Sequence, residues 1–131
     1  MSFVNHLRLS VRDVAASRTF YDPWLRRLGF AAVARDDDGA AWGKPEPDAR
    51  MQWLILTPAR REREHDLFTP GLHHVAFNAG SRAAVDEVGD VLEGLGAEIL
   101  QPAGPYDAEP ELYAVFFLDP DGIKLEVIHA G

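Results

Sequence analysis

Two histidines and one glutamate are the residues whose types and surroundings point most directly to chemistry. His6 and His74 each open a stretch in which apolar and polar residues alternate, and Glu126 lies in a similar stretch near the C-terminus. Alternation is typical of a half-buried strand, because successive side chains point to opposite faces. The apolar residues of each stretch share one face, so the three candidate residues project from the other. Two imidazoles and one carboxylate commonly bind a divalent transition metal and leave coordination positions open for water or substrate.

Each candidate also has a simpler interpretation. A histidine on a strand more often makes a structural hydrogen bond, and a glutamate on a terminal hairpin is usually solvated. The coincidence of all three on one predicted face raises the metal hypothesis to about even with the structural one. Arg8 lies on the same face as His6, about 7 Å along the strand. It could hold an anionic group of a substrate or form a salt bridge at a rim or interface, and both interpretations stay open.

The elements that would position these residues occur twice along the chain, in the same order and at nearly the same spacing. Each copy consists of a strand that begins at a histidine, a helix N-cap, a helix with an apolar stripe and a glycine stop signal. The caps and stops are Asp13 and Gly29 in the first half and Ser81 and Gly96 in the second. Pro23 is expected to kink or restart the first helix, because proline is tolerated only in a helix's first turn.

Short strand-like stretches follow each predicted helix, and each half is therefore β-α-β-β-β. The stretches are 31–34, 40–42 and 51–56 in the first half, and 98–100, 113–118 and 123–128 in the second. The segment 119–122 has proline and glycine where a type I turn prefers them. The sequence predicts an α+β fold in which two βαβββ modules form a curved mixed sheet with helices on one face. We expect a single domain over 1–131, with one module at about 1–60 and the other at about 70–131.

Two further groups of residues could contribute to a site. The segment 102–112 is rich in proline and acid and is predicted to be a loop that could close as a lid. Glu109, Glu111 and Tyr113 are conceivable bases, although solvated loop residues are the simpler interpretation. The tryptophans could line an apolar pocket, but aromatic residues of a small domain are core by default. They are Trp24, Trp42 and Trp53.

Composition excludes several classes of partner. The formal net charge of -8 repels nucleic acids and anionic membranes, and no apolar run approaches the length of a membrane helix. The basic run 60–63 is interrupted by acid and is predicted to be a solvated linker. No cysteine is present, and the N-terminus lacks the features of a secretory signal. These features predict a cytoplasmic protein that binds neither nucleic acid nor membrane.

The residues around the candidate ligands resemble those of the glyoxalase, bleomycin-resistance and dioxygenase superfamily, also called the vicinal oxygen chelate superfamily. The resemblance is carried by 5–13, 17–21 and 28–30 in the first half and by 73–77 and 117–126 in the second. It covers nearly the whole chain and implies that family's fold. It also implies that His6, His74 and Glu126 bind a divalent metal ion, with iron, manganese, zinc, nickel and cobalt all suited to the set. A small-molecule substrate and a homodimer are implied as well, with ligands from one chain or two.

Departures from the family pattern narrow the expected activity. Glyoxalase I usually adds a glutamate on the last strand of the first half, where this chain has an aliphatic residue and Gln52 out of register. Extradiol dioxygenases carry a tyrosine where this chain has Phe116, and a histidine upstream that is missing here. Fosfomycin thiol transferases have a functional threonine where this chain has Arg8.

The activity that remains is that of a metal-dependent lyase, isomerase or transferase acting on a small oxygen-chelating substrate. Glu126 and Arg8 are the expected catalytic residues. The alternative is a metal-free small-molecule binding protein of the bleomycin-resistance type. A regulatory module that retains a vestigial site is a third possibility.

Overall fold

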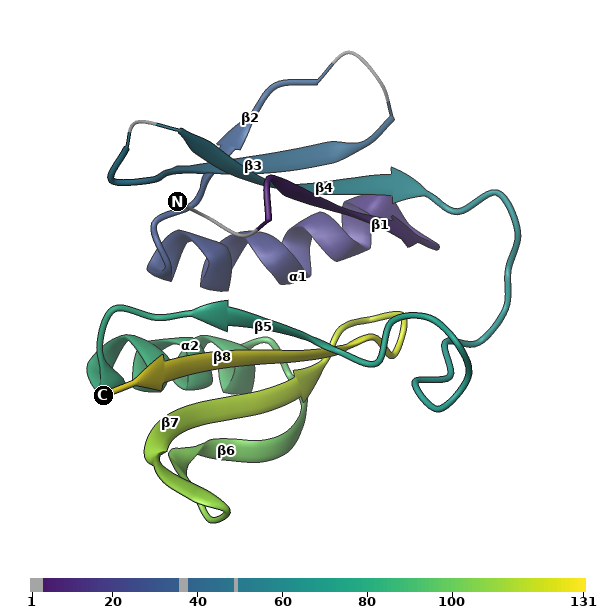
Figure 1. Cartoon of the computed structure of the whole chain (residues 1–131). Helices are drawn as coiled ribbons and strands as arrows, with labels where there is room; N and C mark the ends of the chain where they lie inside the picture. Colours follow the sequence, from purple (N-terminus) through teal and green to yellow (C-terminus); the bar gives the residue numbers. More distant parts are fainter. Residues whose placement is uncertain (1–3, 36–37, 49) are drawn as a thin grey trace. The chain divides into compact units, whose positions relative to one another are not determined.

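The chain forms two compact units, Met1–Arg63 and Glu64–Gly131, each built from one helix and one four-stranded sheet (Figure 1). The computed structural model describes residues 4–35, 38–48 and 50–131. In both units the elements follow the order β-α-β-β-β. The predicted α+β fold of two βαβββ modules is therefore confirmed, and each module has a mixed sheet of its own.

The first unit places its first strand beside its last. The sheet order is β1-β4-β3-β2, in which β1 runs parallel to β4 and the other neighbours are antiparallel. A parallel pair needs a crossover connection, and here α1 provides part of it. The elements are β1 (His6–Val11), α1 (Val14–Arg27), β2 (Ala31–Val33), β3 (Ala40–Pro45) and β4 (Met51–Pro58).

The second unit repeats this arrangement. Its sheet order is β5-β8-β7-β6, with β5 parallel to β8 and the remaining pairs antiparallel. Both units thus bring the strand that follows their histidine next to their last strand. The elements are β5 (Val75–Asn78), α2 (Arg82–Gly94), β6 (Glu98–Tyr106), β7 (Glu109–Leu118) and β8 (Lys124–Ala130).

The predicted helix boundaries are confirmed by their caps. The side chains of Asp13 and Ser81 each accept a hydrogen bond from the backbone N–H three residues later, at 3.1 and 3.0 Å. Each bond satisfies an N–H that has no partner within the helix. Gly29 and Gly96 follow the helices with φ angles of 93° and 69°, in the left-handed region that glycine adopts without strain.

The predicted restart of the first helix at Pro23 is wrong. The helix α1 continues through Pro23 to Arg27. Its apolar face is held in the core, where Tyr21, Trp24 and Leu25 are fully buried. Burial of large side chains contributes more than the ~3 kcal/mol that an interior proline costs, so packing overrides the local preference.

The predicted loop at 102–112 is also wrong. The segment belongs to β6 and β7, which form a hairpin in which Tyr106 pairs with Glu109. Strand β6 lies at the edge of its sheet. Its pairing with β7 is interrupted by register shifts, one of which spans Pro102 while another follows Pro105. Proline is tolerated at an edge and at a bulge because the missing N–H is not needed there.

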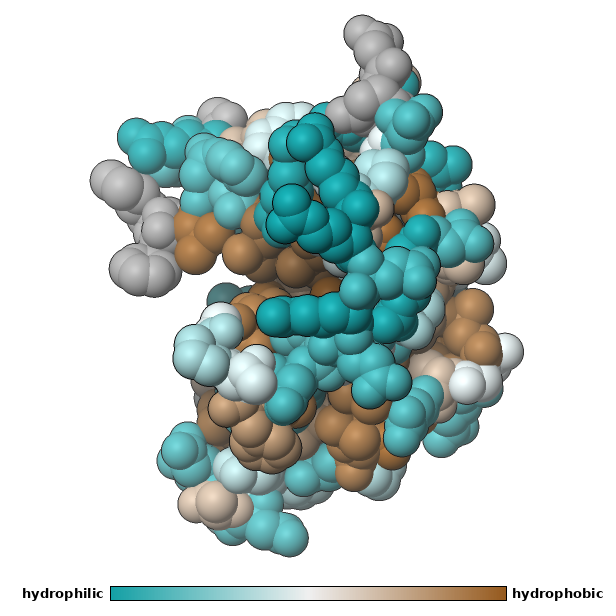
Figure 2. All heavy atoms as spheres, turned by 90° about the vertical axis from the view of Figure 1, so that its right-hand side faces the viewer, coloured by the Kyte–Doolittle hydropathy of each residue, from teal (hydrophilic) through white to brown (hydrophobic). Residues whose placement is uncertain are grey.

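The connection from β4 to β5 is dominated by hydrophilic side chains, which face the viewer in Figure 2. It contains the basic run predicted to be solvated, and its Arg60 and Arg61 are exposed. Among the residues that the structure describes, no helix combines the length and the hydropathy that a membrane span requires.

Candidate metal and substrate site

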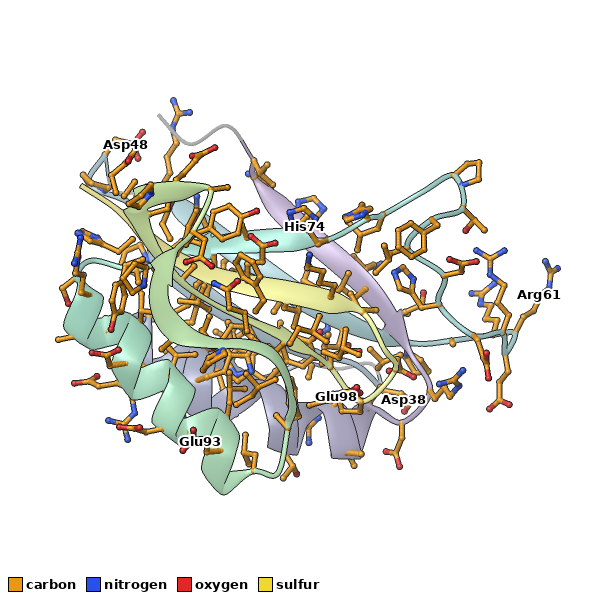
Figure 3. The ribbon with its side chains drawn as sticks, turned by 90° about the horizontal axis from the view of Figure 1, so that it is seen from below. Asp38, Asp48, Arg61, His74, Glu93 and Glu98 are labelled. Atoms are coloured by element: carbon orange, nitrogen blue, oxygen red, sulfur yellow. The ribbon has the colours of Figure 1, made fainter. Side chains whose placement is uncertain are left out.

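The structure brings two of the predicted ligands together in the second unit. Glu126 on β8 pairs in register with Ala76 on β5, two residues after His74, so both side chains lie on the same face of the sheet. His74 Nε2 is 3.2 Å from Glu126 Oε2. Figure 3 labels His74 where the chain enters β5 and Glu93 on α2, on opposite sides of the sheet. The pair therefore occupies the open face, which α2 does not cover.

The opposite face fixes the direction of Glu126. Its neighbours Leu125 and Val127 are fully buried, as are Val85, Val88 and Leu92 of the helix. Strand alternation then forces the carboxylate between them to point away from the core. The side chain of Glu126 is 13% exposed and that of His74 is 36% exposed. The predicted open face of β8 is therefore confirmed.

His73 is a neighbour that the sequence prediction did not single out. Its Nδ1 lies 2.7 Å from His74 Nδ1, and the edge of its ring packs against Phe68 at a centroid distance of 6.0 Å. Of two neutral imidazoles, one Nδ1 must donate and the other accept. If His74 donates through Nδ1, its Nε2 keeps the lone pair that a metal requires.

The carboxylate of Glu126 also has a cationic neighbour, Lys124. Lys124 Nζ lies 3.6 Å from Glu126 Oε2 and 5.2 Å from the ring centroid of Phe116, which is the cross-strand partner of Glu126. The lysine side chain is 20% exposed. Glu126 thus lies between the His74 imidazole and the Lys124 ammonium group, and the ammonium group partly balances its negative charge.

In the first unit, the side chain of Asn5 lies beside the His6 ring. His6 Nδ1 is 2.7 Å from Asn5 Oδ1, and the tautomer with its proton on Nδ1 would donate a hydrogen bond to this oxygen. Nε2 then keeps its lone pair, which is the form that ligates a metal. His6 is exposed on the open face of β1, while Leu9 and Val11, on the other face of the same strand, are buried.

Arg8 is exposed on the same face as His6, in register with Ile55 of β4. Among the residues that the structure describes, no carboxylate of the first unit pairs with its guanidinium. An anionic ligand and a salt bridge at a rim or interface both remain open as partners of this charge.

At the position where glyoxalase I usually has its additional glutamate ligand, this chain has an aliphatic residue. Strand β4 places Ile55 on the open face, while Gln52 shares the opposite face with buried Leu54 and Leu56. Gln52 pairs in register with Lys44 of β3, which is not on the open face either. The sequence inference that Gln52 is out of register is confirmed.

The proposed bases at 109–113 do not lie at this site. The Tyr113 hydroxyl donates to Asp86 of α2 at 2.6 Å, and Arg82 of the same helix lies over the ring at 5.2 Å. This hydrogen bond raises the pKa of the Tyr113 hydroxyl. Tyr113 is therefore on the helix side of β7, and Glu109 and Glu111 are exposed on the hairpin. The structure thus favours the simpler interpretation for the two exposed glutamates and gives Tyr113 a contact with α2 in place of a role as a base at the open face.

The tryptophans divide between core and open face. Trp24 and Trp42 are fully buried, as expected by default, and Trp42 Nε1 donates to Asp22 of α1 at 2.9 Å. Trp53 is only half-buried, and its strand position places it on the open face with Ile55. Strand alternation was the signal in the sequence that distinguished Trp53 from the other two.

The predicted ligands are thus distributed over both units. His74 and Glu126 are close together in the second unit, and His6 belongs to the first. Among the described residues, no group of three or more histidine, aspartate or glutamate side chains forms a metal site. Asn5 and His73, whose side chains contact the rings of the candidate histidines, each directly precede one of them in the chain. Their adjacency to the histidines is visible in the sequence, but the contacts they make are shown only by the structure.

Comparisons with known proteins agree with this architecture. A family model described as the Glyoxalase/Bleomycin resistance protein/Dioxygenase superfamily matches residues 3–127. The protein YqjT of Bacillus subtilis (strain 168) is 32% identical over 129 residues, which are 95% of this chain and 97% of that protein.

Solved structures share the fold. The crystal structure of a candidate glyoxalase from Bacillus halodurans has a TM-score of 0.77 and 29% identity, with 97% of this chain and 95% of that one covered. The fosfomycin resistance protein FosX of Listeria monocytogenes has a TM-score of 0.68 over 100% of this chain and 95% of that one; at 20% identity it shows the fold alone. The family match covers nearly the full length of this chain, and its two modules have the expected order of elements. The chain belongs to the glyoxalase, bleomycin-resistance and dioxygenase superfamily.

Proposed function

We propose that this protein is a metal-dependent enzyme that holds one divalent ion through His6, His74 and Glu126 and acts on a small substrate with two chelating oxygens. The observation that carries the proposal is the 3.2 Å approach of His74 Nε2 and Glu126 Oε2 on the open face of the second sheet. An imidazole nitrogen and a carboxylate oxygen at this distance can both move onto one cation. The ligands would come from both units of one chain or from two chains of a homodimer.

The hydrogen bonds of the histidines support this assignment. His6 Nδ1 faces the side-chain oxygen of Asn5, and His74 Nδ1 faces His73 Nδ1. Metal-bound histidines usually donate their other ring N–H to a fixed partner, which sets the tautomer and the ring orientation. Both histidines have such a partner, so the donor set fits iron, manganese, zinc, nickel or cobalt.

The chain's own residues have separate tasks in such a site. When bound, a divalent ion would supply Lewis-acid polarisation of the substrate oxygens. Glu126 would contribute one negative charge to the donor set, so a site that held a divalent ion would keep a net positive charge able to stabilise negative charge on the substrate oxygens. Arg8, exposed beside His6 and without a carboxylate partner among the described residues of its unit, binds an anionic group and orients the substrate. These tasks suit a lyase, isomerase or transferase.

Metal analysis tests the proposal. Protein reconstituted with Zn²⁺ and freed of excess ion is expected to retain about one equivalent per chain. The variants His6→Ala, His74→Ala and Glu126→Gln should lose it, because each removes a ligand. His129→Gln is the matched control, since His129 Nδ1 hydrogen-bonds the backbone carbonyl of Ala79 at 3.0 Å and is not a proposed ligand. Retention of the ion in His6→Ala would contradict a site that draws on both units.

One observation favours the alternative, a metal-free protein that binds a small molecule. Lys124 already provides a cation 3.6 Å from Glu126, so the carboxylate is balanced without a metal ion. The same zinc experiment separates the two functions, because the alternative predicts no retained ion in the wild type. Proton-transfer turnover in a panel of α-hydroxy acids and α-hydroxy ketones would then be absent as well.

A further inference from the structure

The open face of the first sheet carries a row of residues that extends from the candidate ligand His6. In the strand register, His6 of β1 lies opposite Trp53 of β4, and Trp53 lies opposite Gly43 of β3. Gly43 in turn lies opposite Ala31 of β2. Paired residues share a face of a sheet. The row therefore consists of a candidate ligand, an indole ring and then two positions with almost no side chain.

Only a glycine at position 43 leaves room for the observed position of the Trp53 indole ring. A Cβ at this position would lie 2.7 Å from Trp53 Cζ3, 3.0 Å from Trp53 Cε3 and 2.8 Å from Met51 Cε. These distances are shorter than carbon atoms tolerate, so the benzo edge of the indole lies directly over the backbone of β3. Gly43 itself is buried although it faces the open side, because the side chains of Trp53 and Met51 cover it.

The ring is supported from below but is not enclosed. Trp53 is half-buried, as are Met51 and Ile55 on the same face of β4. An indole that rests on a backbone with part of its surface accessible can stack with a second flat ring. Arg8 lies one position further along the same face, in register with Ile55, and carries a charge for an anionic substituent.

We propose that Trp53, seated on Gly43, is a stacking platform that selects substrates with an aromatic or other flat conjugated group next to their chelating oxygens. The proposal deepens the proposed function and rests on it for the placement of the oxygens near His6. Trp53 acts on specificity: it contacts the part of the substrate that does not react. Substrates with an aliphatic group in the same place gain no such contact.

Mandelate and lactate are suitable probes, because both are α-hydroxy acids and differ in a phenyl or a methyl group. Their dissociation constants with the Zn²⁺-loaded protein are measured by ligand-observed NMR. We expect mandelate to bind roughly three- to tenfold more tightly than lactate to the wild type, which is the range of one aromatic pair. Trp53→Leu should abolish this preference and leave lactate unchanged, and Trp53→Phe should keep most of it.

A second pair of variants tests whether the contact between the indole and Gly43 matters, while Trp53 itself is kept. Gly43→Ala should reduce the mandelate preference, because its Cβ displaces the indole. Gly80→Ala is the matched control, since a Cβ there meets no atom within 4 Å. Iodide quenching verifies that the platform is accessible: Trp24 and Trp42 are fully buried, so quenching reports on Trp53 and should decrease when mandelate binds.

The outcomes separate this inference from the proposed function. An unchanged mandelate-to-lactate ratio in Trp53→Leu, with zinc retained, overturns the platform and leaves the metal site intact. A wild type that does not bind zinc would contradict the metal site. If such a protein still preferred mandelate and the preference depended on Trp53, the platform would be supported in a metal-free binding protein. A wild-type protein that binds both acids equally overturns the platform directly.

Discussion

The ion pair between Lys124 and Glu126 makes a sharp prediction for metal affinity. Lys124 Nζ is 3.6 Å from Glu126 Oε2, and the two side chains are 20% and 13% exposed. A divalent ion on this carboxylate would meet the ammonium charge at close range. We therefore expect Lys124→Met to bind Zn²⁺ more tightly than the wild type, because it removes a competing cation and keeps an apolar stem over Phe116.

The magnitude follows from Coulomb's law. Two unit charges 4 Å apart interact by ~1 kcal/mol in water, so an ammonium and a divalent ion repel by ~2 kcal/mol at that separation. This corresponds to about 30-fold in affinity, and a lysine that turns toward solvent lowers the effect. The expected gain is about three- to 30-fold.

Competition with a zinc-chelating dye at pH 7.5 and 0.1 M salt measures this gain. The matched control is Lys44→Met, which changes the net charge by the same amount and also removes an ammonium above a phenylalanine, Phe30, at 5.8 Å. An unchanged or weaker zinc affinity in Lys124→Met would refute the reasoning. An equal gain in both variants would assign the effect to overall charge and not to the neighbour of Glu126.

Three further predictions concern the elements that hold the site. Pro23→Ala should stabilise the protein by about 1–3 kcal/mol in urea unfolding, because it restores a hydrogen bond inside α1; a destabilised variant would contradict this. Burial raises the pKa of Asp22, but hydrogen bonds from Arg26 and Trp42 outweigh it and leave the pKa below its ordinary value of 3.8. The wild type should therefore be more stable than Asp22→Asn, by less than ~1 kcal/mol because the site is partly exposed. This difference should be complete above pH 3.8 and disappear as the pH falls through the lowered pKa of Asp22. A difference that does not depend on pH would exclude the charge of Asp22 as its cause. Ser81→Ala should lose about 1 kcal/mol with the cap of α2, and an unchanged thermal midpoint would show that the cap bond is not needed.

The sequence was sufficient where local chemistry and burial agree. Alternation placed His6, His74 and Glu126 on open faces, and the caps and glycine stops placed the helices. It failed where tertiary packing overrides a local preference. The core holds α1 as one continuous helix across Pro23, and the edge position of β6 accepts prolines that locally indicate a loop.

The site could be predicted in part for the same reason. Strand periodicity determines the face on which a residue lies, but the contacts within that face depend on side-chain packing. The bond from His6 to Asn5, the pairing of His73 with His74 and the salt bridge of Lys124 therefore appear only in the structure. The position of the Trp53 ring depends on Gly43 of a neighbouring strand and could not be derived from periodicity.

A crystal structure of the zinc-loaded protein with anomalous data at the zinc edge tests the central claim most directly. We predict one anomalous peak about 2.0–2.2 Å from the Nε2 atoms of His6 and His74 and from a carboxylate oxygen of Glu126, drawn from one chain or two. A peak bound to His74 and Glu126 while His6 lies elsewhere, or no peak at these residues, would contradict a metal centre shared by the two modules.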